Sequence, residues 1–203
     1  MNKPAFHTLD SVAIPLDRRN VDTDQIIPAR FLRKPRAAGM ADYLFHDLRR
    51  GEDGRLRADF VLNDSRYAGA AVLISRENFG SGSSREAAVY ALWDYGFRAV
   101  IAPSFGDIFF SNSLKNGLLP VVLDTSSVER LLTGLSSLPG GRVQVDLGDQ
   151  TVTAPDGARY PFDIDPFQKQ LLLSGQDELG YTLALAPKID LFESTRAGRE
   201  PWL

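Results

Sequence analysis

Residues 70–86 read Ala-Ala-Val-Leu-Ile-Ser-Arg-Glu-Asn-Phe-Gly-Ser-Gly-Ser-Ser-Arg-Glu and set the pattern for most of the chain. The first part, residues 70–74, is a continuous apolar run of the kind that forms a strand covered on both faces. Apolar side chains then recur at helical spacing and predict a helix over residues 84–95. The glycine- and serine-rich turn between them presents hydroxyls, backbone N–H groups and an arginine at a helix N-terminus, where an anionic group binds well.

This strand–turn–helix unit is one of several along the chain. The predicted strands cover residues 11–16, 70–74, 98–102, 118–123, 142–147, 151–153 and 160–164. The predicted helices cover residues 41–49, 84–95, 104–116, 126–135, 166–174 and 177–185. The alternation of strands and helices predicts an α/β fold with a mixed, largely parallel sheet and flanking helices. Beyond Pro139 the alternating polar and apolar residues predict a C-terminal β-hairpin region, and residues 196–203 a frayed tail.

Composition favours a single domain over residues 1–203. A chain of 203 residues with 43% hydrophobic content can bury a sizeable core, and no repeat or linker divides it. No apolar run approaches the roughly 20 residues of a membrane span. Residues 1–7 lack the apolar stretch of a signal peptide, which predicts a cytoplasmic protein. The net charge of −3 gives no electrostatic case for a nucleic-acid partner.

Cysteine is absent from the sequence, and histidine is scarce. Without a cysteine the chain has no thiolate nucleophile and lacks the usual ligands of an iron–sulfur cluster. His7 and His46 are the two histidines, and neither lies in a zinc-ligand or catalytic-triad motif. We therefore expect no metal to be bound by this chain and assign neither histidine a role.

Several nucleotide and hydrolase motifs fail at the turn. The residues from Gly80 to Gly82 begin like a dinucleotide-binding fingerprint, but Arg85 stands where a third glycine is needed. No Gly-Lys-Ser/Thr follows to complete a phosphate loop, and no serine has the flanking glycines of a hydrolase elbow. Ser83 and Glu86 do have the spacing of a helix capping box.

A cap alone does not explain Arg85, because a cation in the first helical turn is unfavourable to the helix dipole. A carboxylate or phosphate bound there would explain it, since a guanidinium and the N–H groups of the turn can pair with such an anion together. The same surroundings would stabilise a serine alkoxide, which could remove a proton from a carbon next to a carboxylate. No neighbouring metal ligand is present to take away a hydroxide, so half of such a reaction is missing from this chain.

Three motifs in order carry a family resemblance. They are Val21-Asp22-Thr23-Asp24-Gln25-Ile26-Ile27-Pro28, the turn from Glu77 to Glu86, and the segment from Ser104 through Asn112 to Pro120. Together they resemble the small subunits of 3-isopropylmalate dehydratase, the separate-chain form of the aconitase-superfamily swivel domain. The resemblance covers nearly the whole chain.

This resemblance implies a swivelling β/β/α domain and a hydro-lyase. Such an enzyme isomerises 2-isopropylmalate and 3-isopropylmalate by dehydration and rehydration in leucine biosynthesis. The small subunit would form a heterodimer with a large subunit that holds a four-iron, four-sulfur cluster. The partner's cluster would act as a Lewis acid on the substrate hydroxyl and so supply the missing half of the reaction.

The resemblance also implies roles for individual residues. Ser83 matches the catalytic base, Arg85 the arginine that binds a substrate carboxylate, and Ser84 a further contributor to that anion site. Asp24 matches an aspartate near the active site that supports the acid–base network. The alternative for Asp24 is an Asx-turn residue that only fixes its loop.

The segment after Pro28 corresponds to the part that tunes substrate choice, and Arg30 and Arg33 are candidates for contact with the second carboxylate or the side-chain pocket. Residues 30–39 otherwise look like an exposed, mobile basic loop, and a solvated run of charges is the alternative.

Two positions depart from many members of the family, because Ser81 replaces a cysteine and Ala87 a histidine. Two other functions therefore stay open: a paralogous dehydratase subunit for a related hydroxy-dicarboxylate, of the citraconate or dimethylmalate type, and a non-catalytic anion-binding module.

Overall fold

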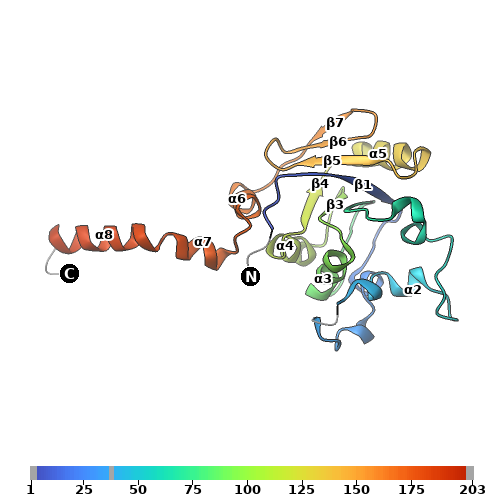
Figure 1. The fold of residues 1–203 in the computed structure, drawn as a ribbon, viewed down its shortest axis with the longest axis horizontal. Coiled ribbons are helices and arrows are strands. Elements are labelled where there is room, and N and C mark those ends of the chain that lie inside the picture. The colour runs from blue at the N-terminus through green and yellow to red at the C-terminus, as the bar shows by residue number, and fades with distance from the viewer. Residues whose placement is uncertain (1–3, 37–38, 200–203) are drawn as a thin grey trace.

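The computed structural model describes residues 4–36 and 39–199, which form a seven-stranded mixed sheet with helices on its two faces (Figure 1). The strands are β1 (Thr8–Leu16), β2 (Val72–Ser75), β3 (Ala99–Ala102), β4 (Leu119–Val122), β5 (Arg142–Asp146), β6 (Thr151–Thr153) and β7 (Arg159–Pro161). They lie in the order β4-β3-β2-β1-β5-β6-β7. Strands β1 to β4 pair in parallel, while β5, β6 and β7 are added antiparallel at the edge of β1. The predicted mixed α/β fold with its β-hairpin region is therefore confirmed.

The helices are α1 (Thr23–Ile26), α2 (His46–Arg49), α3 (Glu86–Tyr95), α4 (Asp107–Lys115), α5 (Thr125–Ser137), α6 (Pro166–Ser174), α7 (Glu178–Ala184) and α8 (Ala186–Arg199). Short 3-10 helices occupy Ala29–Phe31, Ala41–Tyr43, Val61–Asn63 and Ser65–Tyr67. The helix expected over residues 41–49 is broken in two by Phe45, whose φ is +49°. The helix expected from residue 104 begins at Asp107, because the Ser104 hydroxyl accepts from the Asn78 N–H instead of capping it.

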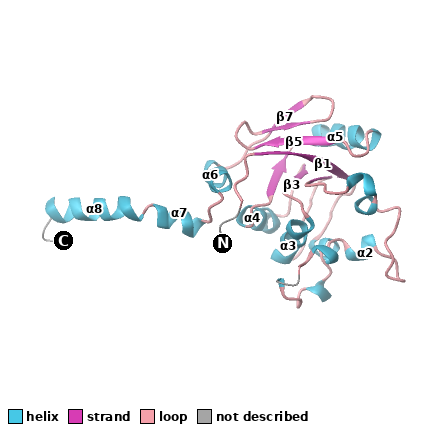
Figure 2. Cartoon of the chain, viewed as in Figure 1, coloured by secondary structure: helices cyan, strands magenta, loops and turns pink. Residues whose placement is uncertain are grey.

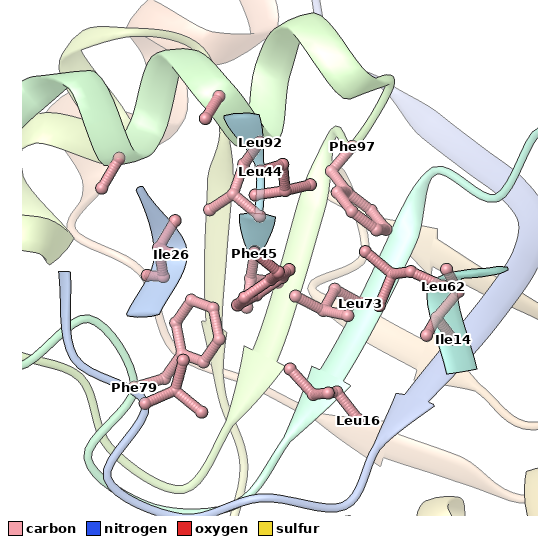
Figure 3. Packing of buried hydrophobic residues seen from close by; sticks show 14 of the residues in the cluster. Ile14, Leu16, Ile26, Leu44, Phe45, Leu62, Leu73, Phe79, Leu92 and Phe97 are labelled. Carbon is pink, nitrogen blue, oxygen red and sulfur yellow. The ribbon is translucent and has the colours of Figure 1, made fainter. Parts of the chain in front are cut away.

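The parallel strands are buried on both faces, as their continuous apolar runs predict. On one face Leu73 belongs to a core that includes α3, α4 and the segment from Phe45 to Phe60 (Figure 3). On the other face Val72 and Ile74 pack in a second core with α5 and the antiparallel strands. Figure 1 shows α3 and α4 on one side of the strands and α5 on the other.

The chain leaves the sheet through α6 and continues as two helices, α7 and α8, that project away from the body (Figures 1 and 2). Of the residues for which a frayed tail is expected, 196–199 form the end of α8 and 200–203 lie outside the described part of the chain. Several large apolar side chains of these helices are exposed. None of the described helices is long and apolar enough to cross a membrane.

Strands β1, β2 and β3 run in the same direction, so their carboxyl ends open at one edge of the sheet. The three motifs follow these ends. Residues 21–28 come after β1, residues 77–86 after β2, and residues 104–117 after β3. Loops at the carboxyl ends of parallel strands are the usual place for a ligand in α/β folds. The topology therefore gathers the three motifs at one edge.

Candidate active site at the carboxyl ends of three strands

Backbone hydrogen bonds tie the first motif to the serine-rich turn. The N–H of Gly80 donates to the carbonyl of Val21 at 2.7 Å, and the N–H of Thr23 donates to the carbonyl of Ser81 at 2.9 Å. Asp22 and Ser81 form a parallel bridge between these bonds. The two segments, about 60 positions apart in the sequence, are thus paired like a short continuation of the parallel sheet.

The third motif holds the turn from the other side. The N–H of Phe79 donates to the carbonyl of Ser104 at 3.0 Å, and the N–H of Gly106 donates back to the carbonyl of Phe79 at 2.9 Å. The buried ring of Phe79 packs edge-on against Phe109 with centroids 5.4 Å apart. In Figure 3, Phe79 and Ile26 point into the same apolar cluster. The turn therefore rests on a rigid, buried base.

Position 80 requires a glycine, because the turn passes very close to α4 there. Its φ of +72° lies in the left-handed region, and a Cβ added to it would lie 2.6 Å from the Cβ of Phe109. Only glycine fits both demands without displacing a buried aromatic ring. At Gly106 a Cβ would likewise lie 2.6 Å from the carbonyl oxygen of Gly80. These close approaches explain two of the glycines in the motifs.

The predicted capping box between Ser83 and Glu86 is wrong. Helix α3 begins two residues later than expected, with Arg85 at the N-cap, and no side chain caps it. The Glu86 carboxylate instead accepts from the Asn116 amide at 2.8 Å, and this bond lowers the pKa of Glu86. Asn116 follows α4, 30 residues away, so local spacing could not reveal the competition.

The uncapped helix end leaves donors available beside exposed hydroxyls. Ser83 and Ser84 are exposed, and their hydroxyls make no hydrogen bond with any other part of residues 4–36 and 39–199. The first N–H groups of a helix lack intrahelical acceptors and attract anions. Two serines and an uncapped end of α3 therefore form one side of a candidate anion site.

Arg85 and Asp24 form the other side of this site, as an ion pair. The Arg85 side chain is 17% exposed, and its buried Nη1 lies against Asp24 Oδ1. A guanidinium carries five N–H donors, so pairing with one carboxylate leaves further donors for a second anion. The sequence placed these two residues in one site, and the structure brings them together.

The Arg85 guanidinium also holds the pKa of the Asp24 carboxyl below its ordinary value. A carboxyl with a depressed pKa stays ionised at neutral pH, and the stability that its pairing contributes is lost only as the pH falls through that pKa. Because Asp24 is 58% exposed, solvent screens the pair and its contribution to folding is small. The main effect of Asp24 is to fix the position of Arg85.

In the segment after Pro28, Arg30 is engaged by a neighbour. Its Nη1 donates to Asp47 Oδ2 at 2.9 Å, its Nη2 also contacts Asp47, and His46 Nδ1 lies 3.2 Å from the same Nη2. The Arg30 guanidinium lowers the pKa of the Asp47 carboxyl to about 2. Arg33 is exposed.

Arg36 contacts α3, the helix that follows the serine-rich turn. Its guanidinium stacks over the ring of Tyr90 in α3, 3.7 Å from the centroid. The exposure predicted for residues 30–39 holds at positions 30, 32–36 and 39, while Phe31 is half-buried against the core and residues 37 and 38 lie outside the described chain.

The side chains that could ligate a metal are scattered over the described part of the chain. The sequence lacks cysteine, and within residues 4–36 and 39–199 no three side chains of histidine, cysteine, aspartate or glutamate gather in one place. An iron–sulfur cluster therefore does not fit the residues of this chain.

Comparison with known proteins identifies the family of this chain. Residues 3–126 match the family model of the aconitase C-terminal domain, and residues 129–166 match a second model, LeuD_N. The 3-isopropylmalate dehydratase small subunit 1 of Bordetella parapertussis is 52% identical over 208 aligned residues, which cover 98% of this chain and 96% of that protein. The chain belongs to the 3-isopropylmalate dehydratase small-subunit family. The small subunit of Leptospira interrogans is also 52% identical, covering 98% of this chain and 97% of its own length.

A solved structure supports the fold of this dehydratase small-subunit family. The crystal structure of the 3-isopropylmalate dehydratase LeuD protein from Methanocaldococcus jannaschii aligns with a TM-score of 0.64 at 26% sequence identity. The alignment covers 93% of this chain and 99% of the archaeal chain. The aconitase-type domain expected from the three motifs is thus confirmed.

Sequence reasoning missed three contacts around the dehydratase-family site. Asp47, Tyr90 and Asn116 engage Arg30, Arg36 and Glu86. Asp47 and Tyr90 lie in other elements, and no spacing rule connects them to the arginines. The sequence gives one sign that Tyr90 lies beside the site: it comes one helical turn after Glu86 and so lies on the same face of α3.

Proposed function

We propose that this chain is the small subunit of a two-chain hydro-lyase that interconverts 2-isopropylmalate and 3-isopropylmalate through the dehydrated alkene, a step of leucine biosynthesis in the cytoplasm. The observation that carries the proposal is the uncapped start of α3, where two exposed serines adjoin Arg85 and its ion pair with Asp24. The names of relatives about 52% identical over nearly the whole chain support this substrate.

In this proposal Ser83 takes the proton from the carbon next to a carboxylate. Loss of that proton and of hydroxide from the neighbouring carbon forms the alkene and water, and the reverse addition at the other carbon gives the isomer. The exposed Ser83 hydroxyl is available for this role because no described side chain binds it. The dipole of α3 and the charge of Arg85 stabilise the alkoxide form.

Arg85, Ser84 and the first N–H groups of α3 hold the carboxylate. The remaining N–H donors of the Arg85 guanidinium and the N–H groups at the helix start are the kinds of group that pair with a carboxylate oxygen. Asp24 keeps the guanidinium in place through its ion pair. The binding is therefore divided between a side-chain cation and the backbone.

A large subunit is part of the proposal because this chain lacks ligands for a cluster. The four-iron, four-sulfur cluster that we expect in the partner would supply the Lewis acid for the substrate hydroxyl. The partner would close over the edge where the carboxyl ends of β1, β2 and β3 meet. A heterodimer with one active site between its chains follows.

Arg30 and Arg33 are proposed contacts for the second carboxylate or for the alkyl pocket. Arg30 would exchange its pairing with Asp47 for the substrate, since the two interactions use the same guanidinium edge. The segment is exposed in the isolated chain and therefore accessible to a partner and a ligand.

The proposal is tested by reconstitution with a cluster-loaded large subunit of the same family. We expect formation of the alkene from 2-isopropylmalate in the mixture and none from either chain alone. Citraconate and 2,3-dimethylmalate serve as competing substrates, and isopropylmalate should give the highest kcat/KM. A mixture that forms a complex but acts only on another hydroxy-dicarboxylate would make the chain a paralogous subunit instead.

Replacement of Arg85 by lysine is expected to raise KM about 10-fold or more. Lysine keeps the charge but loses the planar, two-pronged donor geometry that a carboxylate accepts, and a hydrogen bond to a charged group contributes about 1.5–3 kcal/mol. Steady-state kinetics of the reconstituted complex measure the effect. Arg55→Lys, at an arginine that is 89% exposed in a distant loop, is the control and should leave KM unchanged.

A further inference from the structure

Thr23 lies directly beneath the serine-rich turn and is buried, with 2% of its surface exposed. Its hydroxyl donates to the carbonyl of Ser83 at 3.0 Å, and its N–H donates to the carbonyl of Ser81 at 2.9 Å. Gly82 lies between these two bonds, and a Cβ built on it would be 3.5 Å from the Thr23 hydroxyl oxygen. One buried residue therefore holds the peptides on both sides of Gly82.

The neighbour of Thr23 extends this hold to the next position of the turn. Asp24 pairs with Arg85, so residues 23 and 24 together bind positions 81, 83 and 85. Each contact uses a different group: a backbone N–H, a hydroxyl and a carboxylate. Residues 23 and 24 therefore bind every second residue of the turn from position 81 to position 85.

Helix α1, which begins at Thr23, is itself held firmly. The Asp22 carboxylate accepts from the N–H of Gln25 at 2.7 Å and caps the helix. Ile26 and Ile27 are fully buried in the core beneath it. A side chain anchored on such a base can fix the geometry of a neighbouring loop.

Ser83, by contrast, has little else to hold it. Its side chain is exposed and makes no hydrogen bond within the described residues, and its carbonyl accepts from the N–H of Arg85 at 2.8 Å besides the Thr23 hydroxyl. A reacting hydroxyl must be held close to its productive geometry, and a displacement of about 1 Å can cost about 100-fold in rate.

We propose that Thr23 is a positioning residue for the reaction, whose buried hydroxyl orients the Ser83 peptide so that the Ser83 side chain faces the substrate. This inference rests on the proposed function, because it assigns the reacting group to Ser83. The hydroxyl matters more than the volume of the side chain, since the hydroxyl is the group of Thr23 that binds the Ser83 carbonyl.

The test compares Thr23→Val, which keeps the shape and removes the hydroxyl, with Thr23→Ser, which keeps the hydroxyl. In the reconstituted complex Thr23→Val is expected to lower kcat about 10-fold or more with KM changed less than about threefold, and Thr23→Ser to restore at least half of kcat. Thr8→Val, which removes an exposed hydroxyl bonded to Asp146, is the control and should leave kcat unchanged. If Thr23→Val does not fold, Thr23→Ala removes the same hydroxyl with less bulk.

A double variant separates this inference from the proposed function. If Thr23 acts through Ser83, Thr23→Val should cause no further loss in a Ser83→Ala complex. A Thr23→Val complex with kcat within twofold of the wild type, beside a Ser83→Ala complex that has lost activity, would overturn the positioning role alone. A Ser83→Ala complex that keeps its activity would overturn the base assignment instead. Losses that multiply in the double variant would give Thr23 a role independent of Ser83 and contradict the inference.

Discussion

Ser83→Ala is expected to lower kcat of the reconstituted complex at least about 100-fold, because loss of a general base typically costs that much or more. KM should change little, since Arg85 and the start of α3 still bind the carboxylate in this variant. The exposed Ser83 side chain makes no hydrogen bond within the described residues, so its removal should not unfold the turn. Initial rates of alkene formation, measured over a range of substrate concentrations, separate the two parameters.

Ser81→Ala is the matched control for this variant. It removes a hydroxyl two residues away in the same turn and leaves the Ser81 carbonyl, which accepts from Thr23, in place. We expect kcat of Ser81→Ala within about twofold of the wild type. Equal losses in both variants would indicate a general disturbance of the turn and would remove the special role of Ser83.

Gly80→Ala is expected to destabilise the chain by about 3 kcal/mol. A forced Cβ beside the buried ring of Phe109 costs about 1–3 kcal/mol of overpacking, and the φ of +72° adds about 1–2 kcal/mol for a residue with a side chain. For a chain of this size that loss corresponds to a fall in Tm of roughly 6–12 °C. Thermal unfolding of the isolated chain measures it.

Gly54→Ala is the control for the backbone term, because Gly54 has a φ of +76° and nothing within 4 Å of an added Cβ. We expect it to cost only about 1–2 kcal/mol, from the left-handed backbone alone. Similar Tm values for the two variants would mean that the contact between Gly80 and Phe109 contributes nothing beyond the backbone conformation.

The strands and the gathering of the motifs could be predicted from the sequence because both depend on local patterns. The apolar run before Ser75 is long enough for a covered strand and too short for a helix. The glycines of the turn signal backbone conformations that only glycine adopts readily, and Gly80 and Gly82 both have positive φ. Once β1, β2 and β3 are parallel, the loops that follow them must meet at one edge.

The start of α3 and the partners of the arginines could not be predicted, because they depend on residues distant in the sequence. Glu86 has the right spacing to close a capping box, but its carboxylate accepts a hydrogen bond from the Asn116 amide instead. Arg30 is drawn to Asp47, which lies in a short helix after a 3-10 turn. Tertiary contacts of this kind override local capping preferences.

The C-terminal helices show a different limit of prediction from the sequence. Helix α8 begins right after α7, carries Pro187 in its first turn and continues to Arg199. The sequence there has many good helix formers, but also Gly198 and a proline at position 201, which favoured an earlier end. Helix propensity alone does not fix where a weakly packed terminal helix stops.

The central claim is that Ser83 of this chain removes the carbon-bound proton, and exchange of that proton with solvent tests it most directly. Incubation of the reconstituted complex with 3-isopropylmalate in deuterated water, followed by mass spectrometry, gives the rate of deuterium uptake into the isomers. Ser83→Ala should slow this uptake at least about 100-fold, in step with dehydration, while substrate still binds. Uptake at the wild-type rate in the Ser83→Ala complex would show that another group takes the proton.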